Sequence, residues 1–132
     1  MSSSPSSSLG SPVEEATFPL EARSPARARR FIHDVLRRWA WDGPRRDVEL
    51  LTSELVTNAV LHARSSVDVS IRCTDRGVRV EVADRSAQVP VAQDYRVDAQ
   101  TGRGLVLVER TSTAWGVQQL EVGKTVWFEI AG

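Results

Sequence analysis

Residue types and segments that are rare or absent in this sequence exclude several common classes of protein. Its 132 residues hold one cysteine, Cys73, which excludes an intramolecular disulfide framework and suits a reducing cytosol. No apolar run approaches the roughly 20 residues of a membrane span, and the N-terminus has neither the basic region nor the apolar core of a secretory signal. We therefore expect a cytoplasmic protein that does not associate with membranes.

The protein also has no formal net charge at neutral pH. Seventeen basic residues, sixteen of them arginine, balance seventeen acidic ones, so the overall charge favours neither nucleic acid nor an anionic membrane as a partner. With 41% hydrophobic and 26% charged residues, the composition is that of a soluble globular protein. The length is enough for one domain of ordinary size and too short for two.

The N-terminus differs in composition from the rest of the chain. Residues 2–12 read SSSPSSSLGSP and have almost nothing to bury, so residues 1–14 are predicted to be a disordered Ser/Pro-rich tail. Residues 15–132 are predicted to form the single domain, which contains no internal repeat.

The first elements of the domain are a strand and a helix. Residues 16–22 alternate in character and predict an edge strand, since Pro19 cannot donate to a central ladder. A helix follows, with Ser24 as N-cap and Pro25 at the first helical position. Its apolar residues recur at helical spacing: Ala28, Phe31, Ile32, Val35, Leu36 and Trp39. Its opposite face is rich in arginine and is predicted to be solvated.

The remaining elements follow from changes in hydrophobic period. Residues 45–63 predict a second helix, and residues 67–84 alternate with period two around Asp75-Arg76-Gly77, which predicts a hairpin. Its inward-facing residues would be Val67, Val69, Ile71, Val78, Val80 and Val82. Residues 85–100 lose this periodicity and predict a long loop, and loops of this length are usually functional or disordered. Residues 104–115 predict a third helix, and residues 115–132 a closing hairpin with Gly123 and Lys124 in its turn.

The order of these elements predicts the fold class. It runs strand, two helices, two strands, a loop, a helix and two strands. Because strands and helices do not alternate strictly, we expect an α/β two-layer sandwich, with a mostly antiparallel mixed sheet covered on one face by three helices.

The stretch ELVTNAVLHA, residues 54–63, places polar residues beside an apolar helix face. Glu54, Asn58 and His62 recur every four residues, which stacks their side chains along one stripe of an α-helix. Polar groups so close to an apolar face cost free energy unless something satisfies them. A glutamate there could accept a proton from an attacking hydroxyl, and an asparagine oxygen could bind Mg²⁺.

Two other features could belong to the same site. Asp84 ends the second strand of the hairpin, where its carboxylate can accept a hydrogen bond from an exocyclic amine such as that of adenine. Thr101-Gly102-Arg103-Gly104 opens the third helix, where glycines and free N–H groups favour phosphates. Phosphoryl transfer needs mainly positioning and charge stabilisation, and these features together could supply both.

Each feature alone also has an ordinary explanation. Glu54 and Asn58 could face solvent on a half-exposed helix. Asp84 could be a turn residue, and His62 could be hydrogen-bonded near the helix C-terminus. The sequence has no Walker A motif and no Cys/His cluster with zinc spacing. The combination of the three features, in this order, is more specific than any one of them.

Together the motifs resemble the histidine-kinase-like ATPase (Bergerat) fold, and within it the small anti-sigma-factor serine/threonine kinases of actinobacterial type. ELVTNAVLHA resembles the N box, VADRSAQVP the first glycine box, TGRGLVLVE the second, and GKTVWFEI the closing strand. The resemblance covers residues 50–132 and can be extended upstream through the first strand and helix. One departure is Ser86, which stands where the broader superfamily has glycine.

The resemblance implies a role for each motif residue. Glu54 would be the general base and Asn58 the Mg²⁺ ligand, with His62 in a supporting role. Asp84 would hold the adenine amine, and Thr125 would support it through a shared water. The remaining nucleotide-binding residues would be Ser86, Gly102, Arg103, Gly104 and Leu105. Residues 86–104 would form a short ATP lid.

The implied activity is that of a Mg-ATP-dependent kinase that phosphorylates an anti-anti-sigma (STAS) protein and regulates a sigma factor by partner switching. A homodimer through the first strand and helix is implied as well. Two alternatives stay open. ATP could be a structural ligand that gates a protein interaction without phosphate transfer. The arginine face of the first helix could instead dock a partner or nucleic acid, although the neutral net charge speaks against nucleic acid.

Overall fold

The computed structural model describes residues 12–85 and 106–132. Its elements are β1 (Val13–Phe18), α2 (Ser24–Arg38), α3 (Arg45–Asn58), the short π-helix η1 (Ala59–Ala63), β2 (Val67–Cys73), β3 (Gly77–Asp84), a helix over 106–111, β4 (Ala114–Gln119) and β5 (Lys124–Ala131). The strands and helices follow the predicted order. None of the helices in this described part is long and apolar enough to cross a membrane.

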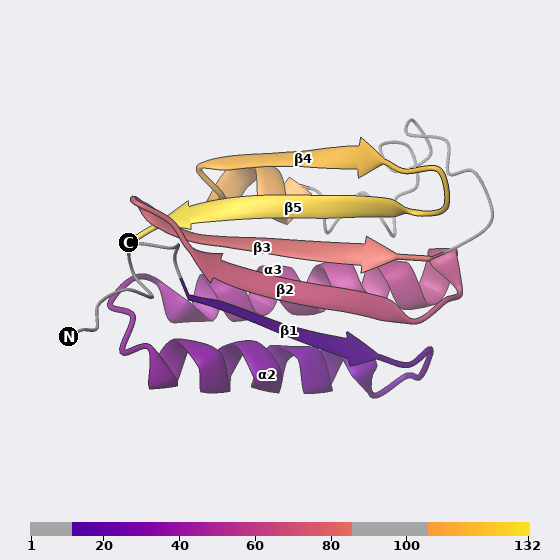
Figure 1. Cartoon of the computed structure of the whole chain (residues 1–132), viewed down its shortest axis with the longest axis horizontal. Coiled ribbons are helices and arrows are strands. Elements are labelled where there is room, and N and C mark those ends of the chain that lie inside the picture. The colour runs from indigo at the N-terminus through magenta and orange to yellow at the C-terminus, as the bar shows by residue number, and fades with distance from the viewer. Residues whose placement is uncertain (1–11, 86–105) are drawn as a thin grey trace.

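All five strands belong to one sheet, in the order β1-β2-β3-β5-β4. Every neighbouring pair is antiparallel, so this sheet is fully antiparallel rather than mixed. The helices lie on one face of the sheet, and no described helix covers the other face (Figure 1). The prediction of a two-layer α/β sandwich is therefore confirmed.

Alternation along the strands separates a buried face of the sheet from a half-exposed one. The strand residues that point toward the helices are buried: Val67, Val69, Ile71, Val78, Val80, Val82, Val126, Phe128 and Ile130. They form one core with apolar residues of α2 and α3, among them Ile32, Leu36 and Leu51. The hairpin residues predicted to face inward do so, because a period of two matches the pleat of a strand.

The uncovered face of the sheet carries a network of charged and aromatic side chains. The Arg79 guanidinium on β3 lies 4.0 Å from the ring centroid of Trp127 on β5. The same guanidinium donates hydrogen bonds to Glu81 (2.9 Å) and Glu129 (3.0 Å). Because these contacts satisfy its charges, this face can stay half-exposed without a covering helix.

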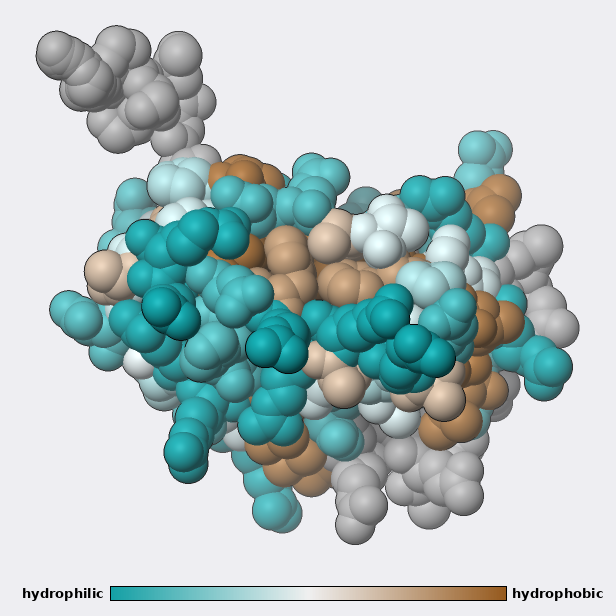
Figure 2. Space-filling model, turned by 90° about the horizontal axis from the view of Figure 1, so that it is seen from below, coloured by the Kyte–Doolittle hydropathy of each residue, from teal (hydrophilic) through white to brown (hydrophobic). Residues whose placement is uncertain are grey.

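The arginine-rich side of α2 faces solvent, as its pattern predicts. The four arginines on that side are exposed: Arg27, Arg30, Arg37 and Arg38. Ala28, Ile32 and Leu36, on the opposite side of the helix, are fully buried. Figure 2 views the molecule from the side of α2 and shows hydrophilic side chains over most of it, with an apolar area among them.

The start of the domain differs from the prediction in two places. β1 begins at Val13, inside the segment predicted to be a tail, and ends at Phe18 rather than at residue 22. Ser24 is the first residue of α2 and not its N-cap, which is Arg23. The buried Ser24 hydroxyl instead donates a 2.6 Å hydrogen bond to the carbonyl of Pro19. The hydroxyl therefore fixes the turn between β1 and α2 and does not cap the helix.

The helix before β4 ends earlier than predicted. It occupies 106–111 of the described residues, and the Thr113 N–H already donates to the Glu129 carbonyl of β5 (2.8 Å). Trp115, which the sequence analysis placed at the end of the helix, lies in β4 opposite Phe128. Pairing with β5 overrides the helical spacing of these residues, since tertiary context outweighs local propensity.

Candidate functional site

Buried polar side chains mark the candidate site. The described residues include six: Ser24, Thr52, Ser53, Asn58, Asp84 and Lys124. The three hydroxyl residues donate to nearby backbone carbonyls, as in the 2.8 Å bond from Thr52 to Val48. Such local bonds explain their burial. Asn58, Asp84 and Lys124 bring an amide and two charges into the interior, which is costlier and needs a specific explanation.

These three residues lie at the same end of the sheet. Asn58 is the last residue of α3, and the chain continues through η1 and a turn into β2. Val67, the first residue of β2, pairs with Asp84, and Asp84 pairs with Lys124 at the start of β5. In Figure 1 this is the end where the β3 arrow points and where β5 begins. The C-terminal end of α3 and the last residue of β3 therefore lie toward the same end of the sheet, as the sequence pattern suggests.

The helix that carries Asn58 changes its winding directly after it. Ala59–Ala63 form the π-helix η1, in which the N–H of Arg64 donates to the Ala59 carbonyl five residues earlier (3.1 Å). Arg64 then ends the helix in the left-handed conformation, with φ 56°. Because a π turn holds more residues than an α turn, the regular four-residue stripe ends at Asn58. His62 belongs to the π turn and is half-buried, as is Glu54 on α3.

Asp84 and Lys124 form a buried ion pair. The Lys124 ammonium (Nζ) donates to Asp84 Oδ2 over 2.6 Å, and the two side chains are only 4% and 3% exposed. A charge this deep in a protein is strongly destabilising unless it is paired. The Lys124 ammonium therefore donates to one carboxylate oxygen of Asp84, the residue that was predicted to accept a hydrogen bond from a nucleotide base.

The sheet register separates Thr125 from this pair. Thr125 pairs with Ala83, so its side chain points to the uncovered face while Asp84 and Lys124 point to the helix face. The residue beside Asp84 is thus Lys124, which the sequence analysis passed over. The alternation along the closing strand could have indicated that Lys124 faces the core. Every second residue from Lys124 onward is apolar and expected to be buried: Val126, Phe128 and Ile130.

Several predicted site residues lie outside the described part of the chain. They are Ser86, Gly102, Arg103, Gly104 and Leu105. The proposed lid, residues 86–104, lies there as well. The described residues therefore supply the part of the site that α3, β3 and β5 carry.

The side chains at this end of the sheet fit a magnesium ion that is also bound by a nucleotide better than an ion bound by protein side chains alone. Among residues 12–85 and 106–132, no group of three or more His, Cys, Asp or Glu side chains could hold a metal. Mg²⁺ commonly takes one or two protein oxygens together with substrate phosphates and water. The buried Asn58 amide offers one such oxygen, so it fits an ion that arrives with a nucleotide.

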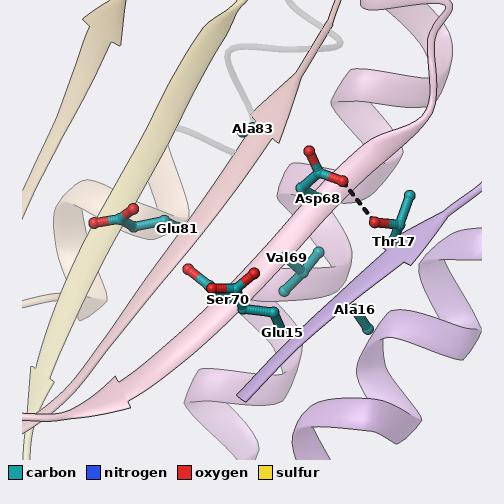
Figure 3. Close-up of a pocket in the computed structure, with 8 residues that line it drawn as sticks. All are labelled: Glu15, Ala16, Thr17, Asp68, Val69, Ser70, Glu81 and Ala83. Atoms are coloured by element: carbon teal, nitrogen blue, oxygen red, sulfur yellow. Dashed lines mark hydrogen bonds between the residues drawn. The ribbon is translucent and has the colours of Figure 1, made fainter. Parts of the chain in front are cut away.

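A shallow hollow of about 210 Å³ lies on the opposite, uncovered face of the sheet (Figure 3). Its lining residues are Glu15, Ala16, Thr17, Asp68, Val69, Ser70, Glu81 and Ala83. Two of its carboxylates have protein partners: Asp68 accepts from Thr17 (2.7 Å) and Arg85 (2.8 Å), and Glu81 accepts from Arg79 (2.9 Å). Since Asp84 faces the helices, this hollow is separate from the buried polar residues.

Another hollow lies on α2 and α3 and is lined by Arg29, His33, Arg45, Arg46 and Glu49. Glu49 lies 3.0 Å from His33 Nδ1 and 3.6 Å from Arg29 Nε. These contacts are partly exposed to solvent, so each contributes little to the free energy of folding. The hollow is consistent with a solvated, ion-paired face of α2.

Known proteins share both the sequence pattern and the fold. The family model of the histidine kinase-like ATPase domain matches residues 18–130. The crystal structure of the RsbU and RsbW domains of Rv1364c from Mycobacterium tuberculosis is similar, with a TM-score of 0.70 and 20% sequence identity; the match covers 91% of this chain and 32% of that chain. No curated protein matches the sequence. On the family match, this chain belongs to the histidine kinase-like ATPase domain family.

Proposed function

We propose that the protein binds Mg-ATP and is an anti-sigma-factor-type serine/threonine kinase, which phosphorylates an anti-anti-sigma (STAS) protein. The observation that carries this proposal is the burial of Asn58 and Asp84 at one end of the sheet in a histidine kinase-like ATPase domain. Buried amide and carboxylate side chains, each held by neighbouring groups, are common features of ligand-binding sites.

Nucleotide recognition is assigned to Asp84 and Asn58. The Asp84 carboxylate accepts a hydrogen bond from the exocyclic amine of adenine. The Asn58 oxygen would hold the Mg²⁺ that accompanies the phosphates, and this ion would supply charge stabilisation during the transfer. Gly102, Arg103 and Gly104 are assigned to the phosphates, and Ser86, Leu105 and His62 to supporting contacts. Thr125 is left out, because the register turns it to the other face.

Glu54 is assigned the role of general base. It lies one helical turn before Asn58 on α3 and is half-buried. Its carboxylate accepts the proton of the substrate hydroxyl while that oxygen bonds to the γ-phosphorus. The bond from phosphorus to the β–γ bridging oxygen breaks, and ADP leaves with the electron pair. The protein contributes positioning and charge stabilisation, which are what phosphoryl transfer chiefly needs.

The partners are assigned from the motifs of the chain. The likeness of ELVTNAVLHA, VADRSAQVP and TGRGLVLVE to the anti-sigma-factor kinases supports a STAS protein as substrate and a sigma factor as the regulated partner. The neighbouring solved structure contains an RsbW domain beside an RsbU domain, and this chain covers 32% of it.

Calorimetric titration with ATP, with and without Mg²⁺, tests the site. We expect saturable binding that Asp84→Asn weakens by tenfold or more, since one hydrogen bond to a charged group contributes about 1.5–3 kcal/mol. Asn58→Ala should remove the dependence on Mg²⁺. Thr125→Ala is the matched control, because it lies beside Lys124 in sequence but on the other face, and it should bind as the wild type does. No binding at millimolar ATP would overturn the proposal.

The competing function is an ATP-gated interaction module without phosphate transfer. Transfer of radioactive γ-phosphate to the STAS proteins encoded in the same genome separates the two. A kinase should label one of them, and Glu54→Gln should abolish labelling while ATP binding stays intact. If no STAS protein is labelled although ATP binds, the module is the correct description.

A further inference from the structure

We propose that Lys124 is a positioning and specificity-determining residue of the nucleotide site. Its ammonium holds the Asp84 carboxylate in one orientation as a hydrogen-bond acceptor, and thereby restricts the site to bases that present an N–H donor. This inference rests on the proposed function, since it concerns how Asp84 reads a base. Lys124 would act through Asp84 and would not itself contact the base.

The first support is the burial of the pair. Both side chains are at least 96% removed from solvent, and Lys124 Nζ lies 2.6 Å from Asp84 Oδ2. A buried charge is costly unless an opposite charge lies beside it. Lys124 supplies that charge for Asp84, and its short contact holds the carboxylate in place.

The second support is the way the backbone holds the two residues. Asp84 and Lys124 are direct partners in the antiparallel pairing of β3 and β5. Gly123, with φ 83°, approaches so closely that an added Cβ would overlap the Asp84 carbonyl oxygen and lie 3.0 Å from Asp84 Oδ1. Lys124 therefore contacts one carboxylate oxygen while the Gly123 backbone flanks the other, which fixes the orientation of the acceptor.

The chemical consequence concerns the base. A carboxylate offers only acceptors. Adenine presents an amine at its six position and can donate to the carboxylate. Hypoxanthine presents a carbonyl there and would place one acceptor against another. With Lys124 in place the site should prefer ATP to ITP. Without the ammonium, the Asp84 carboxylate can turn away from the base, and the preference should fall.

The experiment measures the ratio of dissociation constants for ITP and ATP. We expect at least about a tenfold preference for ATP in the wild type, the size of one charge-assisted hydrogen bond. Lys124→Met should lower the ratio to less than about threefold, because Asp84 is no longer held in one orientation. A purely structural role for Lys124 would weaken the binding of both nucleotides equally and leave the ratio unchanged.

Three further variants make the result decisive. Lys124→Arg keeps the charge and should keep the preference. Lys124→Gln is shorter and neutral, so it should not hold Asp84 as the ammonium does, and it should lose the preference even if Lys124→Met does not fold. In the Asp84→Asn background, adding Lys124→Met should leave the ratio unchanged. A changed ratio there would mean that Lys124 reads the base directly, which would overturn the inference.

The outcomes separate this inference from the proposed function. If the wild type binds ATP and Lys124→Gln keeps a tenfold preference, Lys124 is not a specificity residue and the nucleotide site stands. If the wild type binds neither ATP nor ITP, the proposed function fails and the inference fails with it.

Discussion

Asp84 and Lys124 lie directly opposite each other on β3 and β5, and their charged groups meet at 2.6 Å in the interior of the protein. The same alternation that buries Val80, Val82 and Phe128 places these two polar residues on the core side of the sheet. The candidate site is thus the polar end of the hydrophobic core.

Removing only one member of the buried pair should lower the stability of the protein strongly. Lys124→Met leaves the Asp84 carboxylate without its counter-charge and should lower the free energy of unfolding by roughly 3–5 kcal/mol. The double variant Asp84→Leu, Lys124→Met removes both charges and should be closer to the wild type than either single variant. Urea denaturation followed by circular dichroism measures all three. Single variants within 0.5 kcal/mol of the wild type would contradict the paired arrangement.

Gly123 should tolerate no side chain. Its φ of 83° lies in the left-handed region, and a Cβ would overlap the backbone of Asp84. Gly123→Ala should therefore cost more than the roughly 1–2 kcal/mol of the conformation alone. Gly123→Asn is the comparison, because asparagine adopts positive φ more readily but has the same Cβ. If the close approach dominates, both variants lose similar stability in urea; a nearly unaffected Gly123→Asn would show that only φ matters.

Phe128 should be the core residue whose truncation is most costly. It is fully buried on β5, where it pairs with Val80 of β3 and Trp115 of β4. Phe128→Ala should lower the free energy of unfolding by about 3–5 kcal/mol through lost burial and a new cavity. Val117→Ala, at a position that is 38% exposed on β4, serves as the control and should change stability by less than about 1 kcal/mol. Thermal and urea denaturation of the two variants test this order.

Cys73 should react slowly with thiol reagents in the folded protein. Burial raises the pKa of the Cys73 thiol, so a smaller fraction is thiolate at neutral pH than in the unfolded chain. The rate of reaction with a disulfide reagent, followed from pH 7 to 10, should have its midpoint at higher pH in the folded protein than in urea. A folded midpoint at or below the unfolded one would refute this.

The raised pKa of the Cys73 thiol also predicts how the stability of the protein changes with pH. A thiol whose pKa is raised in the folded state contributes stability that is fully present below its unfolded pKa and is lost as the pH rises through the folded pKa. Cys73→Ser should remove this loss, so the difference in stability between wild type and variant should depend on pH only in the alkaline range. Urea denaturation at pH 7 and pH 10 measures the difference.

Periodic segments of this fold could be predicted from sequence because their physics is local. The hairpin from Val67 to Asp84 and its inward valines follow from a period of two and a glycine-containing turn. Segments without a clear period could not be placed so well. Ser24 reads as a helix cap, yet its hydroxyl bonds to Pro19, since the turn from β1 brings that carbonyl within reach.

Spacing along the chain is enough to predict the order of the elements, their apolar faces and the motifs that identify the family. Which side chains meet depends on the fold instead. The pairing of β3 with β5 sets Lys124, and not Thr125, beside Asp84. The alternation along β5 already indicates that Lys124 faces the core, but the residue of β3 opposite it follows only from the register of the two strands. The π turn likewise ended the polar stripe at Asn58, because the winding of a helix end depends on what it packs against.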